Sequence, residues 1–183
     1  MNNDGEDMEI EMPQVQKPDS EEQIRVRAVV YLADRQGNLL LLRRADSGHW
    51  SLPGGLLRAG ESLVEAARRG TLEQTGLVLA GLELVNVFSG KQMTDRSPAG
   101  EVLYYVSAAF LPDAAQGKIH VNSQEFSEVR FFATWNLPHD QFYPVDAPAV
   151  AHFVERYPGG RPQTLEDMRT NRAGINRINP EKG

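Results

Sequence analysis

Residues 50–77 read WSLPGGLLRAGESLVEAARRGTLEQTGL, and this stretch decides the fold that we expect for the chain. It opens with a tight PGG turn at residues 53–55, and a second turn is expected at residues 58–60. Residues 61–75 then form one helix-like run. Gly76 closes this run, because glycine suits the left-handed backbone position just past the end of a helix.

The expected helix carries polar side chains that can meet on one surface. Glu73 and Gln74 lie three and four residues after Gly70, so these three positions are neighbours on the helix. Oxygen ligands gathered there would suit a hard cation such as Mg²⁺, which keeps some of its waters and binds phosphate substrates. Arg69 lies four residues after Glu65 and four before Glu73, so it can pair with either acid.

The stretch resembles the Nudix box, whose pattern is G-x5-E-x7-R-E-U-x-E-E-x-G-U, where U is a bulky aliphatic residue. The positions that match at the right spacing are Gly55, Glu61, Arg69, Glu73, Gly76 and Leu77. Three positions depart from the pattern. Gly70 and Gln74 stand where the family has glutamates, and Thr71 stands where it has an aliphatic residue.

The resemblance implies a set of functional residues and a cation, Mg²⁺ or Mn²⁺. Glu128 is included because relatives often have a further metal-binding or water-orienting glutamate just before the corresponding strand. The residues implied to hold the metal are Gly55, Glu73, Gln74 and Glu128. The residues implied to act in catalysis are Glu73, Glu61, Arg69 and Glu128.

Each of these positions also has a structural interpretation. Glu73 can be a surface glutamate paired with Arg69, and Glu128 can be an ordinary charge at a strand edge. Glu61 or Ser62 can cap the helix start, where negative charge is favourable. Gly70 costs about 1 kcal/mol relative to alanine inside a helix, so it is either tolerated or opens room in the cleft.

The charge of the chain is concentrated at its start. Residues 1–22 hold eight acids and one lysine, whereas the remaining residues hold seventeen acids and eighteen bases. The body therefore lacks the basic excess that binding to duplex nucleic acid needs. There is no cysteine, no membrane-spanning run and no signal-like start, so we expect a soluble cytoplasmic protein.

Apolar periodicity outside the box predicts mostly strands. We expect strands at residues 23–31, 39–42, 82–88, 102–111, 118–121 and 128–133, and a helix at 147–157. The first two strands would form a hairpin, and the loop at residues 90–100 could reach over a site. Together with the resemblance, this order predicts an α+β fold, an α/β/α sandwich with a mixed β-sheet between helices.

The expected organisation is a disordered acidic tail at residues 1–22, a Nudix domain at 23–157 and a polar tail at 158–183. The resemblance implies hydrolysis of the diphosphate linkage of a nucleoside diphosphate derivative. Because the box departs at three positions, the alternative is a catalytically weak or inactive module that binds nucleotides or proteins. We expect a small-molecule partner, no duplex nucleic acid and no membrane, with a homodimer as a further option.

Overall fold

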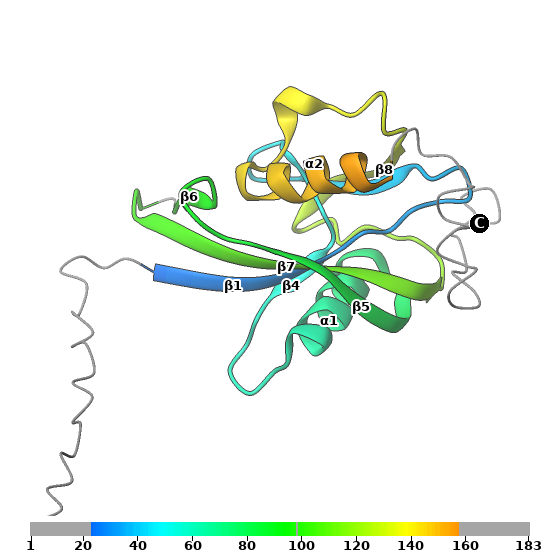
Figure 1. Ribbon diagram of the computed structural model, residues 1–183, viewed down its shortest axis with the longest axis horizontal. Coiled ribbons are helices and arrows are strands. Elements are labelled where there is room, and N and C mark those ends of the chain that lie inside the picture. Colours follow the sequence, from blue (N-terminus) through cyan, green and yellow to red (C-terminus); the bar gives the residue numbers. More distant parts are fainter. Residues whose placement is uncertain (1–22, 98, 158–183) are drawn as a thin grey trace, which may run out of the picture.

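The computed structural model describes residues 23–97 and 99–157 (Figure 1). The tails expected at residues 1–22 and 158–183 lie outside the described residues. None of the described helices is long and apolar enough to cross a membrane. The elements are β1 (Gln23–Val30), β2 (Leu39–Arg44), β3 (Trp50–Ser51), β4 (Gly54–Leu56), α1 (Leu63–Thr75), β5 (Val78–Phe88), β6 (Thr94–Arg96), β7 (Val102–Gln116), β8 (Phe126–Phe132), the 3-10 turns η1 (His139–Gln141) and η2 (Pro144–Asp146), and α2 (Ala147–Arg156).

Two β-sheets form the centre of the fold. Sheet A has the order β4-β1-β7-β5, with β6 paired to β7, and sheet B has the order β3-β2-β8. Sheet A is mixed, because β1 runs parallel to β7 and antiparallel to β4. In Figure 1, α1 lies on one side of sheet A and α2 lies on the other. This arrangement confirms the expected α+β fold with a mixed sheet between helices.

The alternation of side chains along β1 builds a separate core on each face of sheet A. Ala28 and Val30 pack with Ala66 and other residues on the α1 side. Val29, in contrast, packs with Phe153 and other residues on the α2 side. Successive strand residues point to opposite faces, so β1 contributes side chains to both cores. The core on one face packs against α1.

Local capping explains where α1 begins and ends. Ser62 is the N-cap, and its hydroxyl accepts the backbone N–H of Glu65 at 3.2 Å. The Glu65 carboxylate in turn accepts the backbone N–H of Ser62 at 2.8 Å, which completes a capping box. Gly76 has the left-handed conformation, with φ of 73°. The end of the helix at Gly76 was therefore predicted correctly. Of the two candidate caps, Glu61 and Ser62, the structure selects Ser62, so the helix begins at Leu63 and not at residue 61.

The hairpin expected between residues 23–31 and 39–42 forms only at its tip, where the Leu40 N–H donates to the Leu32 carbonyl at 2.8 Å, and β1 and β2 themselves do not pair. Both edges of β1 are already paired, one with β4 and the other with β7. β2 joins sheet B instead, and an isolated bridge between Ala33 and Leu39 links the two segments. β5 and β7, by contrast, form an antiparallel hairpin in sheet A.

One strand that we expected is absent from the described residues, and one expected loop contains a short strand. The segment at residues 118–121 is irregular, because its backbone binds the end of α1 instead of a strand. His120 N–H donates to the Thr75 carbonyl at 3.0 Å, and carbonyls in a last helical turn have no partner within the helix. The loop at residues 90–100 contains β6, which pairs with β7 and extends the hairpin along the sheet.

Candidate active site

The PGG turn of the box runs into β4, the strand at one edge of sheet A, which pairs with β1. The carbonyl of Pro53 accepts the N–H of Val30 at 2.9 Å, and Gly54 pairs with Val29 across β4 and β1. At Gly54 a Cβ atom would lie 2.1 Å from the carbonyl oxygen of Ala28. Glycine is required here because the backbone of β1 fills the space that a side chain would need.

The same turn rests directly on α1. A Cβ atom at Gly70 would lie 2.3 Å from the Gly54 carbonyl oxygen, and one at Gly55 would lie 2.9 Å from the Ala66 carbonyl oxygen. The absent side chain of Gly70 therefore does not open room in a cleft, since the turn occupies that space. The side-chain oxygen of Gln74 also reaches the turn, where it accepts the N–H of Gly54 at 2.9 Å.

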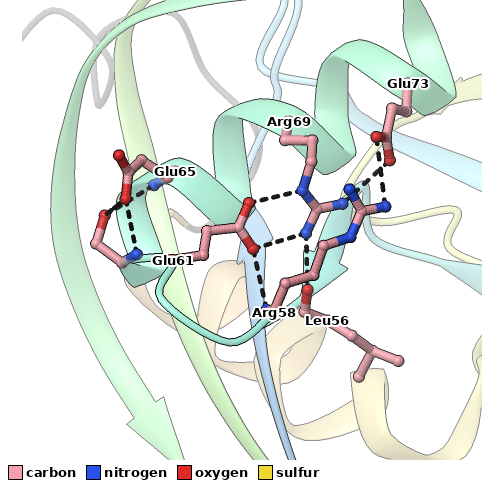
Figure 2. Close-up of polar contacts among 7 residues, drawn as sticks. Leu56, Arg58, Glu61, Glu65, Arg69 and Glu73 are labelled. Atoms are coloured by element: carbon pink, nitrogen blue, oxygen red, sulfur yellow. Dashed lines mark hydrogen bonds and ion pairs between the residues drawn. The ribbon is translucent and has the colours of Figure 1, made fainter.

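Arg69 is the centre of a network of charged groups along α1 (Figure 2). Its guanidinium donates to both oxygens of Glu61, at 2.6 and 2.9 Å, and to the Leu56 carbonyl at 2.8 Å. It also donates to Glu73 at 3.1 Å. Arg58 approaches Glu73 from the preceding turn at 3.5 Å. Glu73 is thus held between two arginines, yet 48% of its side chain is exposed.

The network changes the protonation behaviour of its strongest pair. Hydrogen bonds from Arg69 are the main reason that the pKa of Glu61 falls to about 2. The same pairing with Glu61 raises the pKa of Arg69. Because a charge-assisted bidentate contact is stronger than a neutral hydrogen bond, Glu61 holds Arg69 in position for Glu73.

We expect the effect of Glu61→Gln on stability to depend on pH. A lowered pKa in the folded state contributes stability above the ordinary value of 4.5, and this contribution is lost as the pH falls towards about 2. Urea unfolding should therefore show the native protein as the more stable of the two at neutral pH, with the difference shrinking between pH 4.5 and 2. The exposed Glu83→Gln variant is the control. A difference that stays constant over this range would contradict the role of Glu61.

Glu128 lies away from this network. It forms ion pairs with Arg43 of β2 and Arg130 of β8. Its neighbours Val129 and Phe131 pack into the core on the α1 side. Since strand residues alternate between faces, the Glu128 side chain lies on the opposite face of sheet B. The structure therefore brings Gly55, Glu61, Arg69, Glu73 and Gln74 together and leaves Glu128 apart.

The described residues do not fit a cation held by the protein alone. Among residues 23–97 and 99–157, no three His, Cys, Asp or Glu side chains gather at one point. Gly70 has no ligand atom on a side chain, and Gln74 is already bonded to Gly54. Glu73 supplies a single carboxylate. Mg²⁺ is bound through one or two carboxylates together with substrate phosphates, so a cation here would also need the phosphates of a substrate. The metal and catalytic assignments stay predictions.

Sequence reasoning missed a buried ion pair that supports the turn. Asp146 is fully buried, with Oδ1 2.9 Å from Arg27 Nη1, in an ion pair that lacks the alignment of a hydrogen bond. Its Oδ2 accepts the N–H of Leu52 at 3.1 Å, one residue before the PGG turn. Burial raises the pKa of Asp146, although Arg27 opposes this. The sequence indicated this ion pair only weakly, because the alternation along β1 placed Arg27 on the polar face of the strand.

Comparison with known proteins agrees with this geometry. The family model described as NUDIX domain matches residues 23–153. The chain belongs to the Nudix family. Nudix hydrolases generally use divalent metal cations and act on small nucleotide derivatives.

Individual relatives support the same assignment. An ADP-ribose pyrophosphatase of Methanocaldococcus jannaschii is 32% identical over 114 residues, which are 61% of this chain and 63% of the relative. A MutT-like protein of Streptomyces ambofaciens is 40% identical over 65 residues, which are 36% of this chain and 41% of the relative. The chain thus spans less than two thirds of the length of either protein.

A solved structure shows a similar fold over nearly its full length. The MutT Nudix hydrolase of Burkholderia pseudomallei has a TM-score of 0.58 and 26% identity, over 73% of this chain and 97% of that one.

Proposed function

We propose that the protein hydrolyses the diphosphate linkage of a nucleoside diphosphate derivative at the Nudix box, in the presence of Mg²⁺ or Mn²⁺. The observation that carries the proposal is the retained half of the box, in which Arg69 joins Glu61 to Glu73. Glu73 is the box carboxylate that remains half exposed. The match to an ADP-ribose pyrophosphatase supports the class of substrate.

The charges beside Glu73 support the binding of a diphosphate. An open depression of about 540 Å³ adjoins the network, lined by residues 58–61 and by Glu65, Arg68 and Arg69. Guanidinium groups suit phosphate oxygens, so a diphosphate can replace Glu73 as the partner of Arg58. That exchange would free one carboxylate oxygen of Glu73 to orient a water molecule, while the other oxygen stays bonded to Arg69.

The reaction breaks one bond between phosphorus and the bridging oxygen. Water attacks one phosphorus of the diphosphate, and the other phosphate leaves with the bridging oxygen. The products are a nucleoside monophosphate and a second phosphorylated compound. Because Gly70 and Gln74 replace two carboxylates, we expect turnover slower by about 10²- to 10⁴-fold than a site with its general base in place.

The second candidate is a Nudix module that binds nucleotides without turning them over. The close approach of Gly70 to the Gly54 carbonyl favours this second candidate, because position 70 cannot supply a carboxylate to the site. Gln74 favours it as well, because its side-chain oxygen binds the turn. Both candidates place the same class of ligand at the box, so a binding assay alone does not separate them.

We expect Glu73→Gln to reduce kcat/KM by at least about 100-fold, because the side chain keeps its size and loses its charge. The assay uses a panel of dinucleoside diphosphates, sugar nucleotides and nucleoside triphosphates with Mg²⁺ or Mn²⁺, and it measures the released monophosphate. Glu83→Gln removes an exposed glutamate from β5 and serves as the control, with unchanged turnover expected.

Two results would count against hydrolysis that depends on Glu73. One is a native protein that binds a nucleotide of the panel without turnover, which supports the second candidate. The other is turnover that Glu73→Gln leaves unchanged. Gly70→Glu is unsuitable as a gain-of-function variant, because the Gly54 backbone occupies the space of its first side-chain carbon.

A further inference from the structure

Gly70 and Gln74 stand where the Nudix box has glutamates, and both contact the PGG turn. The Cβ that any other residue would carry at Gly70 would lie 2.3 Å from the carbonyl oxygen and 2.4 Å from the carbonyl carbon of Gly54, and 2.6 Å from the nitrogen of Gly55. All three atoms belong to the backbone, which sheet A holds through the pairing of β4 with β1. The helix and the turn are therefore in direct backbone contact.

Gln74 makes a second contact one helical turn further along α1. Its side-chain oxygen accepts the backbone N–H of Gly54 at 2.9 Å. Gly70 and Gln74 are four residues apart, so they lie on the same face of the helix, and both meet the peptide units around Gly54. One position provides the space for close approach, and the other provides the hydrogen bond.

We infer that Gly70 and Gln74 together form a clamp that closes the PGG turn onto α1 without a bound cation. The remaining carboxylate of this region, Glu73, is held by Arg58 and Arg69. No trio of acidic or histidine ligands exists among the described residues. The nucleotide-free protein therefore needs no divalent ion to order this turn, and the clamp stands whether or not the protein hydrolyses a nucleotide.

The clamp reverses the usual effect of one substitution. Alanine normally stabilises a helix interior relative to glycine. At Gly70 the added methyl group would separate the turn from α1, so Gly70→Ala should lower the Tm instead. We expect a decrease of at least about 4 °C in a protein of this size. Arg68→Ala, at an exposed position of the same helix, is the matched control and should leave the Tm almost unchanged.

Gln74 acts as a positioning residue for the Gly54 amide, and amide exchange reports on this directly. In Gln74→Ala, the Gly54 N–H should exchange with solvent about tenfold faster than in the native protein, since its acceptor is lost. Gln74→Glu retains an acceptor and should restore the protection. Gln92→Ala removes an exposed glutamine outside the box and is the control. NMR-detected hydrogen exchange on the full chain gives these rates.

Whether the turn needs a cation is tested with Mn²⁺ alone, without nucleotide. The native protein should have the same Tm in Mn²⁺ and in EDTA, and a calorimetric titration with Mn²⁺ should show no binding at micromolar concentrations. Equal Tm values, a lowered Tm in Gly70→Ala and rescue by Gln74→Glu would support the clamp. Micromolar binding of Mn²⁺ by the native protein, a higher Tm in Gly70→Ala, or unchanged Gly54 exchange in Gln74→Ala would overturn it.

Discussion

Asp146→Ala is expected to lower the free energy of unfolding by about 3–5 kcal/mol, because it leaves the buried guanidinium of Arg27 without its partner. Arg27 is only 8% exposed, so water cannot replace the carboxylate well. The substitution also removes the acceptor of the Leu52 N–H. Urea unfolding followed by circular dichroism measures the loss, which corresponds to a decrease in Tm of about 10 °C.

The control is Asp46→Ala, which removes an exposed partner of Arg44. The Asp46 side chain is 61% exposed, so the expected loss is below about 1 kcal/mol. Combining Asp146→Leu with Arg27→Met should cost less than the sum of the single changes, since no charge remains buried. A loss for Asp146→Ala as small as that for Asp46→Ala would show that the pair does not support the fold.

Gly54→Ala is expected to cost about 4 kcal/mol, from backbone strain and overpacking together. Its φ of 150° is unfavourable for alanine, and the methyl carbon would lie 2.1 Å from the Ala28 carbonyl oxygen. Both atoms are anchored in paired strands, so one strand must move. We therefore expect loss of the β1–β4 pairing and of nucleotide binding as well as a lower Tm.

Gly60→Ala distinguishes the effect of backbone strain from the effect of the steric clash that is expected in Gly54→Ala. Gly60 also has a positive φ, of 80°, but nothing lies within 4 Å of the position that a Cβ would take. It should cost about 1–2 kcal/mol, from strain alone. Equal losses for Gly54→Ala and Gly60→Ala, by urea unfolding, would show that the close approach to β1 is not what requires glycine at Gly54.

Local patterns in the sequence were enough to predict α1 and part of the site. The spacing of Arg69 and Glu73 predicted their pairing, because residues four apart on a helix are neighbours. The other strong partner of Arg69 is Glu61, eight residues away, which this rule did not predict. Ser62 and Gly76 marked the ends of the helix through capping preferences, which act over only a few residues. Such signals can be read without knowing the rest of the fold.

Strand partners could not be predicted in the same way. The alternation of β1 showed that the segment is a strand, but it does not specify which strands pair with its two edges. β4 and β7 pair with both edges, and β2 is therefore placed in sheet B. For the same reason, the sequence could not show that Glu128 faces away from α1.

What the sequence determined by itself was the family, the capped helix and the charged row along it, because each depends on short-range spacing. The tertiary structure alone decided the roles of Gly70 and Gln74, since their contacts reach Gly54, which lies about 16 and 20 residues earlier in the chain. It also decided the burial of Asp146 with Arg27, which depends on α2 covering one face of sheet A. The physical reason is that close backbone contact and burial arise only when separate segments pack together.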